Sequence, residues 1–269
     1  MLSLAGCSGQ NSLNRERSPH GIHPPSTFEH AGDDLDDAAV FEQLHQLSHP
    51  GATLDELQRA MDGYRHLEAR VLEGKSPLSA CQIRWRLART MFLASEKVAT
   101  VEEKKAWIQS GETDAQKVLE NCKESVEGLY YAAVLKGRRA ELSGNGFKAL
   151  RLVREVLALG KKAAALDPAY DHAAPLRLLA MLYAKAPPWP ASIGDIDLAL
   201  ETAERALEIS DYPMNHLILA EVLIEDDDYS RARNELNAVL SAPVTGDWAK
   251  EGIQWRPYAE KLFQAIAEK

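Results

Sequence analysis

From about residue 37 onwards, apolar residues recur at three- and four-residue spacing along almost the whole chain. Clear examples are "LDELQRAMDGYRHLEARVL" (54–72), "KALRLVREVLALGKKAAAL" (148–166) and "DIDLALETAERALEI" (195–209). This spacing is typical of amphipathic helices that bury one face. No alternating run rich in Val, Ile and Thr competes with it, and the helical segments are short and separated by Gly, Pro, Asp or Asn. The pattern therefore predicts an all-α protein of about ten to twelve helices that stack as antiparallel pairs.

Small residues recur within this pattern at positions where helices would approach closely. On the first helix of each predicted pair they are Leu87-Ala88, Ala132-Ala133, Leu179-Ala180 and Leu219-Ala220, at spacings of 45, 47 and 40 residues. The second helices end in "ALDPAY" after Ala163 and in "EISDYP" after Ala199 and Ala206. These segments resemble tetratricopeptide repeats, most clearly over 147–243. We expect residues 37–269 to form a tetratricopeptide-like helical-hairpin solenoid. The alternative is an irregular helical bundle whose alanines coincide by chance.

Charge and hydropathy argue against a nucleic-acid-binding protein and against a segment that spans a membrane. The formal net charge is −9, and no stripe of Lys and Arg of the kind that binds nucleic acid is evident in the sequence. No run of 18 apolar residues exists in the chain as given, so none of its segments is predicted to span a bilayer.

The N-terminal segment carries a candidate membrane anchor. Leu4-Ala5-Gly6-Cys7 resembles the lipobox of bacterial lipoproteins, in which the cysteine sulfur is lipidated, so residues 1–7 are expected to be the remnant of a lipoprotein signal. Residues 8–36 are rich in Ser, Asn, Pro, His, Gly and Asp, as expected of a flexible polar tether. Ser8 resembles the outer-membrane sorting pattern, which implies an envelope lipoprotein that faces the periplasm. The alternative is a chance tetrapeptide at the front of a cytoplasmic protein.

A longer resemblance lies in residues 175–235. Its elements are Tyr183, Ala186-Pro187, Pro190, Ser192, Gly194-Asp195, Asn215-His216-Leu217 and Ala220-Glu221. This pattern resembles the T-component family of tripartite ATP-independent periplasmic (TRAP) transporters, although Pro188 stands where that family is expected to have glycine. The resemblance implies a periplasmic tetratricopeptide-like lipoprotein that works alongside a solute-binding protein.

The loop over 185–194 is an insertion between two helices and holds three prolines and a tryptophan. Prolines reduce the freedom of the unfolded chain and so make a rigid loop less costly to order. We expect the loop to wall a ligand cavity or a partner groove, whereas in the alternative Trp189 plugs the core. The predicted ligand- or partner-binding residues are Tyr183, Pro187, Trp189, Pro190, Ser192, Ile193, Asp195, Asn215, His216 and Glu221.

Two function classes follow from these features. The first is an accessory protein that handles a small organic or hydrophobic ligand together with a solute-binding protein. The second is a tetratricopeptide scaffold lipoprotein that binds another envelope protein and has no small-molecule ligand. Either one is compatible with a homo-oligomer.

The remaining candidates for chemistry have simpler explanations. His20, His23 and His30 lie in the predicted tether, and His45, His49 and His66 lack the spacing of a metalloprotease site. The acidic runs at 33–37 and 225–228 lack the glycine and terminal glutamate of a calcium loop. We therefore expect no enzyme activity, no metal site and no cofactor.

Cys81 and Cys122 are the two cysteines within the helical region. If the segments at about 80–98 and 102–122 form an antiparallel hairpin, Cys81 opens the first helix and Cys122 closes the second, which places both at the same end. That arrangement permits a disulfide in an oxidising compartment if the Cα atoms lie within about 7 Å of each other. Two buried free thiols are the alternative.

Overall fold

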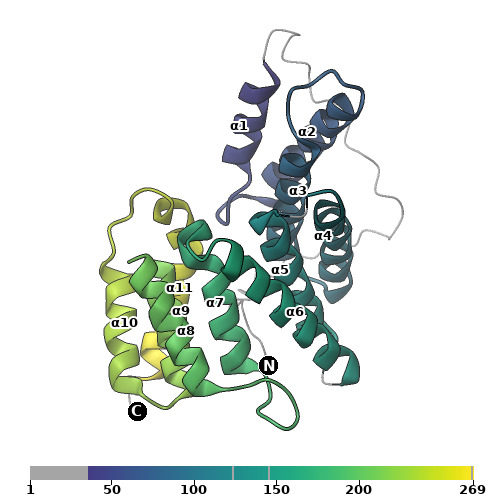
Figure 1. Cartoon of the computed structure of the whole chain (residues 1–269). Helices are drawn as coiled ribbons and strands as arrows, with labels where there is room; N and C mark the ends of the chain where they lie inside the picture. Colours follow the sequence, from purple (N-terminus) through teal and green to yellow (C-terminus); the bar gives the residue numbers. More distant parts are fainter. Residues whose placement is uncertain (1–35, 123, 145, 268) are drawn as a thin grey trace.

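The computed structural model describes residues 36–122, 124–144, 146–267 and 269. Eleven helices lie within these residues, which agrees with the predicted number (Figure 1). They are α1 (Asp37–Leu47), α2 (Leu54–Leu72), α3 (Ala80–Ser95), α4 (Val101–Asn121), α5 (Val126–Leu142), α6 (Phe147–Leu166), α7 (Tyr170–Lys185), α8 (Ile196–Ile209), α9 (Pro213–Glu225), α10 (Tyr229–Ser241) and α11 (Trp248–Ala265). The predicted anchor residue Cys7 and the predicted tether lie outside the described residues, apart from Asp36.

Local sequence signals fix several helix starts. Thr53 with Glu56, Ser79 with Gln82 and Thr100 with Glu103 form capping boxes at the starts of α2, α3 and α4. In each box the hydroxyl accepts a bond from a backbone N–H of the first turn while the Glu or Gln side chain returns to the backbone of the cap residue. The helices therefore begin where their sequences supply these partners.

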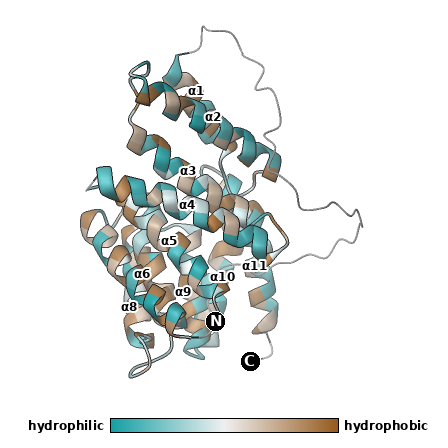
Figure 2. Ribbon diagram, turned by 90° about the vertical axis from the view of Figure 1, so that its right-hand side faces the viewer, coloured by the Kyte–Doolittle hydropathy of each residue, from teal (hydrophilic) through white to brown (hydrophobic). Residues whose placement is uncertain are grey.

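The helices pack in two layers. Helices α3, α5, α7, α9 and α11 contact one another in sequence and form an inner layer, and α4, α6, α8 and α10 cover it from outside. Each helix carries both hydrophilic and hydrophobic positions, as amphipathic helices of a layered fold must (Figure 2).

The predicted close-packing alanines lie between the inner helices and the outer helices that follow them. Ala88, Ala133, Ala180 and Ala220 are all completely buried. On α8 of the outer layer, Ala199, Ala203 and Ala206 are equally buried. A larger side chain at these positions would hold the helices apart, so the alanine repeat sets the spacing of the layers.

The two ends of the helical array meet across its concave side. Lys250 on α11 donates to the side-chain oxygen of Gln46 on α1 at 2.6 Å. On the same side, Lys97 donates to the carbonyl oxygen of Pro50 at 2.6 Å. These bonds join the end of α1 to α11 and the loop after α1 to the loop after α3.

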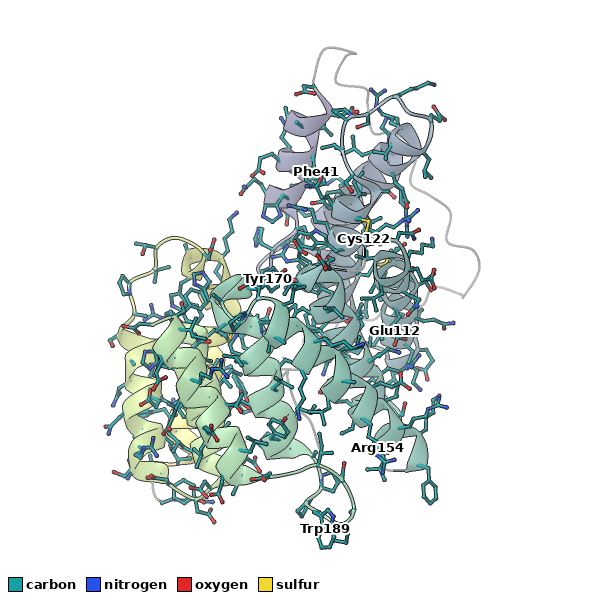
Figure 3. The ribbon with its side chains drawn as sticks, in the orientation of Figure 1. Phe41, Glu112, Cys122, Arg154, Tyr170 and Trp189 are labelled. Carbon is teal, nitrogen blue, oxygen red and sulfur yellow. A yellow bond between two sulfur atoms is a disulfide. The ribbon has the colours of Figure 1, made fainter. Side chains whose placement is uncertain are left out.

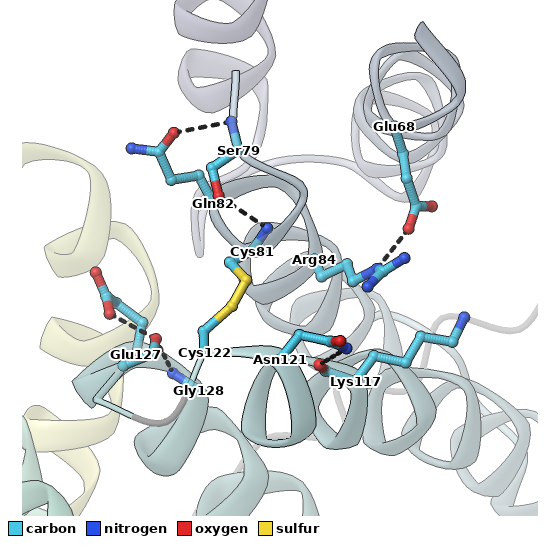
Figure 4. Close-up of a disulfide and its surroundings, with 11 residues drawn as sticks. Glu68, Ser79, Cys81, Gln82, Arg84, Lys117, Asn121, Cys122, Glu127 and Gly128 are labelled. Carbon is cyan, nitrogen blue, oxygen red and sulfur yellow. Dashed lines mark hydrogen bonds and ion pairs between the residues drawn. A yellow bond between two sulfur atoms is a disulfide. The ribbon is translucent and has the colours of Figure 1, made fainter. Parts of the chain in front are cut away.

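Cys81 and Cys122 form a disulfide between α3 and α4 (Figure 4). Their Cα atoms are 6.4 Å apart, and the two residues lie at the same end of the α3–α4 hairpin, as expected. Cys81 lies in the first turn of α3, and Cys122 is the residue that caps the end of α4.

Removing this disulfide should destabilise the protein. The bridge spans a sequence separation of 41 residues, and a loop of that size corresponds to about 3–4 kcal/mol in the chain-entropy model. The double variant Cys81→Ser/Cys122→Ser should therefore unfold at lower denaturant concentration than the wild type, and reduced wild type should behave like the variant. Thiol counting on denatured, unreduced protein checks the bond itself. Two free thiols in addition to Cys7 would contradict it.

Candidate ligand cavity

A cavity of about 170 Å³, here named the central cavity, lies on the concave side of the inner layer. All five inner helices α3, α5, α7, α9 and α11 contribute to its lining, and Pro50 from the loop after α1 completes it. Most of the wall is apolar and consists of Phe92, Leu93, Val134, Leu178, Met181, Met214, Leu217, Ile218 and Trp255. The cavity thus occupies the groove that the repeat architecture forms.

Arg89 and Lys97 are the cations of the cavity lining that form no ion pair with any described residue. Arg89 lies on α3 among residues that face the core, and it donates to the carbonyl oxygen of Ser48. Within the described part of the chain Arg89 takes part in no ion pair. A buried cation that is hydrogen-bonded but not paired with a carboxylate can still meet an acceptor group on a ligand.

Three glutamates, Glu96, Glu221 and Glu251, line the same cavity, and Glu96 is paired with Arg138. Burial raises the pKa of Glu221 to about 7, and the hydrogen bond with Tyr258 opposes that rise. Burial also raises the pKa of Glu251, whose carboxylate accepts a 2.8 Å bond from the hydroxyl of Tyr212. Near neutral pH, Glu221 therefore exchanges between the protonated and ionised forms.

The start of α7 contains an unusual backbone segment at the cavity wall. Asp171, His172 and Ala173 have φ angles of 47°, 55° and 65°, a left-handed conformation that is unfavourable for residues other than glycine. Arg177 stabilises it by donating to the carbonyl oxygens of Asp171 and His172. The segment brings Asp171 into the cavity lining.

Asn215 completes the support of this segment and does not line the cavity. It is 1% exposed, and its amide nitrogen donates to the carbonyl oxygens of His172, Ala206 and Ser210. Its side-chain oxygen accepts from Arg177 at 3.0 Å. The backbone N–H of Asn215 is also used, because it donates to the carbonyl oxygen of Tyr212. In the structure Asn215 therefore ties the start of α7 to the end of α8.

The other predicted binding residues are distributed around this region. The ring nitrogens Nδ1 and Nε2 of His216 form hydrogen bonds with Glu235 at 2.6 Å and with Asp211 at 2.8 Å, respectively. These bonds raise the pKa of His216. Tyr183 is buried in the core, and Ile193 packs against the same cluster. Asp195 accepts from the backbone N–H of Leu198 and caps α8. Among the ten predicted residues, Glu221 alone lines the central cavity.

The proline-rich loop lies away from the cavity. Trp189 is 84% exposed and points outward at the end of the α7–α8 hairpin, so it neither lines the central cavity nor plugs the core, and its role in binding a partner stays a prediction (Figure 3). Pro187 and Pro190 are exposed as well, and Ser192 is half-buried.

The hydrogen bonds of the loop explain this outward direction. The N–H of Gly194 donates to the carbonyl of Pro187, and the N–H of Asp195 donates to the carbonyl of Tyr183, so the loop folds back on itself. A Cβ at Gly194 would collide with the carbonyl oxygen of Ala186. The glycine therefore permits a closed loop whose tip faces solvent.

Most of the polar cavity residues were not predicted from the sequence. Arg89, Asp171, Arg177 and Glu251 come from different helices or their ends. The one available signal was a charged residue on an apolar helix face, as at Arg89 in "RWRLART". Within the described residues, no group of three or more His, Cys, Asp or Glu side chains is placed to hold a metal ion. None of the described helices is long and apolar enough to cross a membrane.

The raised pKa of Glu221 predicts a pH-dependent stability difference. The unfolded chain loses this proton near pH 4.5 and the folded chain near pH 7, so ionisation destabilises the fold progressively between these values, by about 3 kcal/mol in total. Glu221→Gln cannot ionise, so its melting temperature relative to wild type should rise between pH 5 and pH 8. Exposed Glu201→Gln is the matched control and should follow the wild type. Parallel pH profiles for wild type and Glu221→Gln would contradict the assignment.

Comparison with known proteins agrees with this architecture. A solved structure described as a thermophilic TPR protein of Thermus thermophilus superposes with a TM-score of 0.63 at 14% sequence identity, covering 85% of this chain and 99% of that chain. The fold is therefore of the tetratricopeptide type, and the irregular-bundle alternative is excluded. No curated protein matches the sequence. The family model of the TRAP transporter T-component matches residues 83–249, more than half of the chain. The chain thus belongs to the TRAP transporter T-component family.

Proposed function

We propose that this protein is a non-enzymatic accessory of a TRAP-type organic solute transporter, and that it holds a small organic ligand in the central cavity. In this proposal it faces the periplasm, is anchored by a lipid at Cys7, and works alongside a solute-binding protein. The Cys81–Cys122 disulfide supports an oxidising compartment such as the periplasm.

The chemistry of the central cavity carries the ligand part of the proposal. Ligand sites are concave and mainly apolar, with a few polar groups that fix orientation. Apolar residues from five helices supply the wall, while Arg89, Glu221 and Glu251 supply polar groups. A volume of about 170 Å³ is close to that of cavities that hold one benzene-sized molecule.

The second candidate function is a scaffold that binds an envelope protein and no small molecule. The concave groove of a solenoid is the usual binding surface for such partners. Here α11 and Pro50 contribute to the lining, and the Lys97–Pro50 and Lys250–Gln46 bonds tie the groove together across its opening. These features favour a small ligand over an extended peptide in the groove.

Filling the cavity separates the two candidates. Met214 lines the cavity and is half-buried, so Met214→Trp should occupy ligand space at a cost of about 1–3 kcal/mol in stability. Native mass spectrometry of purified protein, with indole added as a probe, should show a bound small molecule on the wild type and a loss of binding in Met214→Trp. Trp189→Ala is the control, because this exposed change should shift stability by less than about 0.5 kcal/mol and leave binding intact. Equal binding in Met214→Trp would place the ligand elsewhere, and a wild type that binds nothing would favour the scaffold.

The lipid anchor is tested independently. Protein expressed with a complete signal peptide should partition with membranes, and Cys7→Ser should release it into the soluble fraction. A triacylated cysteine is required for stable anchoring, because a single acyl chain binds membranes only marginally. Cys7→Ser protein that still sediments with membranes after a salt wash would contradict the anchor.

A further inference from the structure

A second hollow, here named the basic hollow, lies at the opposite end of the α4–α5 pair from the disulfide. It has a volume of about 300 Å³ and is separate from the central cavity in its lining residues. The polar rim comes from α4 (Lys105 and Gln109), from the end of α5 (Arg139) and its cap residue Ser143, and from α6 (Lys148), and Ile108 contributes an apolar floor. Three cationic side chains thus converge from three different helices.

The charges of this hollow are only partly balanced. Arg139 donates to Glu112 at 2.7 Å, but its Nε atom is buried and has no partner. Lys105 and Lys148 form no hydrogen bond or ion pair with any described residue. Burial raises the pKa of Glu112. The basic hollow therefore carries a net positive charge, although the whole chain has a formal net charge of −9.

The rim consists mainly of hydrogen-bond donors. Lysine ammonium and arginine guanidinium groups can only donate, and the side-chain amide of Gln109 adds two further N–H bonds. Such a set is complementary to a group with several acceptor oxygens and negative charge. Phosphate oxygens accept several such bonds at once, and bonds between charged partners are about twice as strong as neutral ones.

We propose that the basic hollow binds a phosphate group. Two sources carry this chemistry: the headgroup of an anionic phospholipid and a free phosphate or phosphomonoester. Phe147, the first residue of α6, is 94% exposed beside Lys148 and would lie against the lipid if the phosphate belongs to a membrane. The proposal is independent of the ligand assigned to the central cavity.

The test uses the full chain with Cys7→Ser, so that no lipid anchor contributes to vesicle binding. Inorganic phosphate is titrated at constant ionic strength by calorimetry, and vesicles of phosphatidylglycerol or phosphatidylcholine are tested by co-sedimentation. Lys105→Ala/Lys148→Ala should weaken phosphate binding by about tenfold or more, because it removes two of three charged donors. Lys161→Ala/Lys162→Ala removes the same charge from exposed positions on α6 outside the hollow and should bind like the parent chain.

Comparing vesicle binding with binding of inorganic phosphate identifies the source of the phosphate. Binding to phosphatidylglycerol vesicles that is lost in Lys105→Ala/Lys148→Ala and weakened by Phe147→Ser identifies a lipid headgroup. Binding of inorganic phosphate without vesicle binding identifies a free phosphate ligand. The proposal is overturned if the parent chain binds neither probe, or if Lys161→Ala/Lys162→Ala weakens binding as much as Lys105→Ala/Lys148→Ala does.

Discussion

The close packing of each inner helix against the outer helix that follows it is the constraint on which the rest of this structure depends. Alanines at 88, 133, 180 and 220 are completely buried between these helices, and a larger side chain there would hold the two layers apart. Repeats stacked in this way form a superhelix with a concave side. The central cavity lies on that side and is lined by all five inner helices, so the candidate ligand site depends on the same packing that stabilises the repeats.

Removing a polar group from water inside such a groove costs free energy, and three polar groups of the cavity reduce this cost in different ways. Arg89 uses the backbone carbonyl of Ser48 as its partner, Glu251 uses the hydroxyl of Tyr212, and Glu221 is stabilised by partial protonation. Each solution avoids a buried, unpartnered charge, which would otherwise be strongly destabilising. The left-handed segment at 171–173 is held in the same manner, because Arg177 and Asn215 satisfy the backbone groups it exposes.

The sequence was sufficient for the helices, the repeat alanines and the shared end of Cys81 and Cys122, since all of these follow from local spacing. The sequence was not sufficient to predict which residues line the central cavity. The cavity joins Arg89 on α3 to Glu251 on α11, and no local pattern relates residues that are so distant in the chain. Asn215 was assigned to binding through its match to the family pattern and its place at a helix start, whereas here its side chain donates to three backbone carbonyls. The prolines of the 185–194 loop favoured a rigid loop, but the direction in which the loop points depends on hydrogen bonds that composition does not encode.

The bond between Lys250 and Gln46 joins residues 204 positions apart. In an open solenoid each repeat contacts only its neighbours, so the terminal repeats unfold independently of each other. A contact between the first and last helices changes this relation, because fraying of α1 then also removes a partner from α11. The two ends of the array are therefore coupled directly through this exposed bond, in addition to the coupling that passes through the repeats between them.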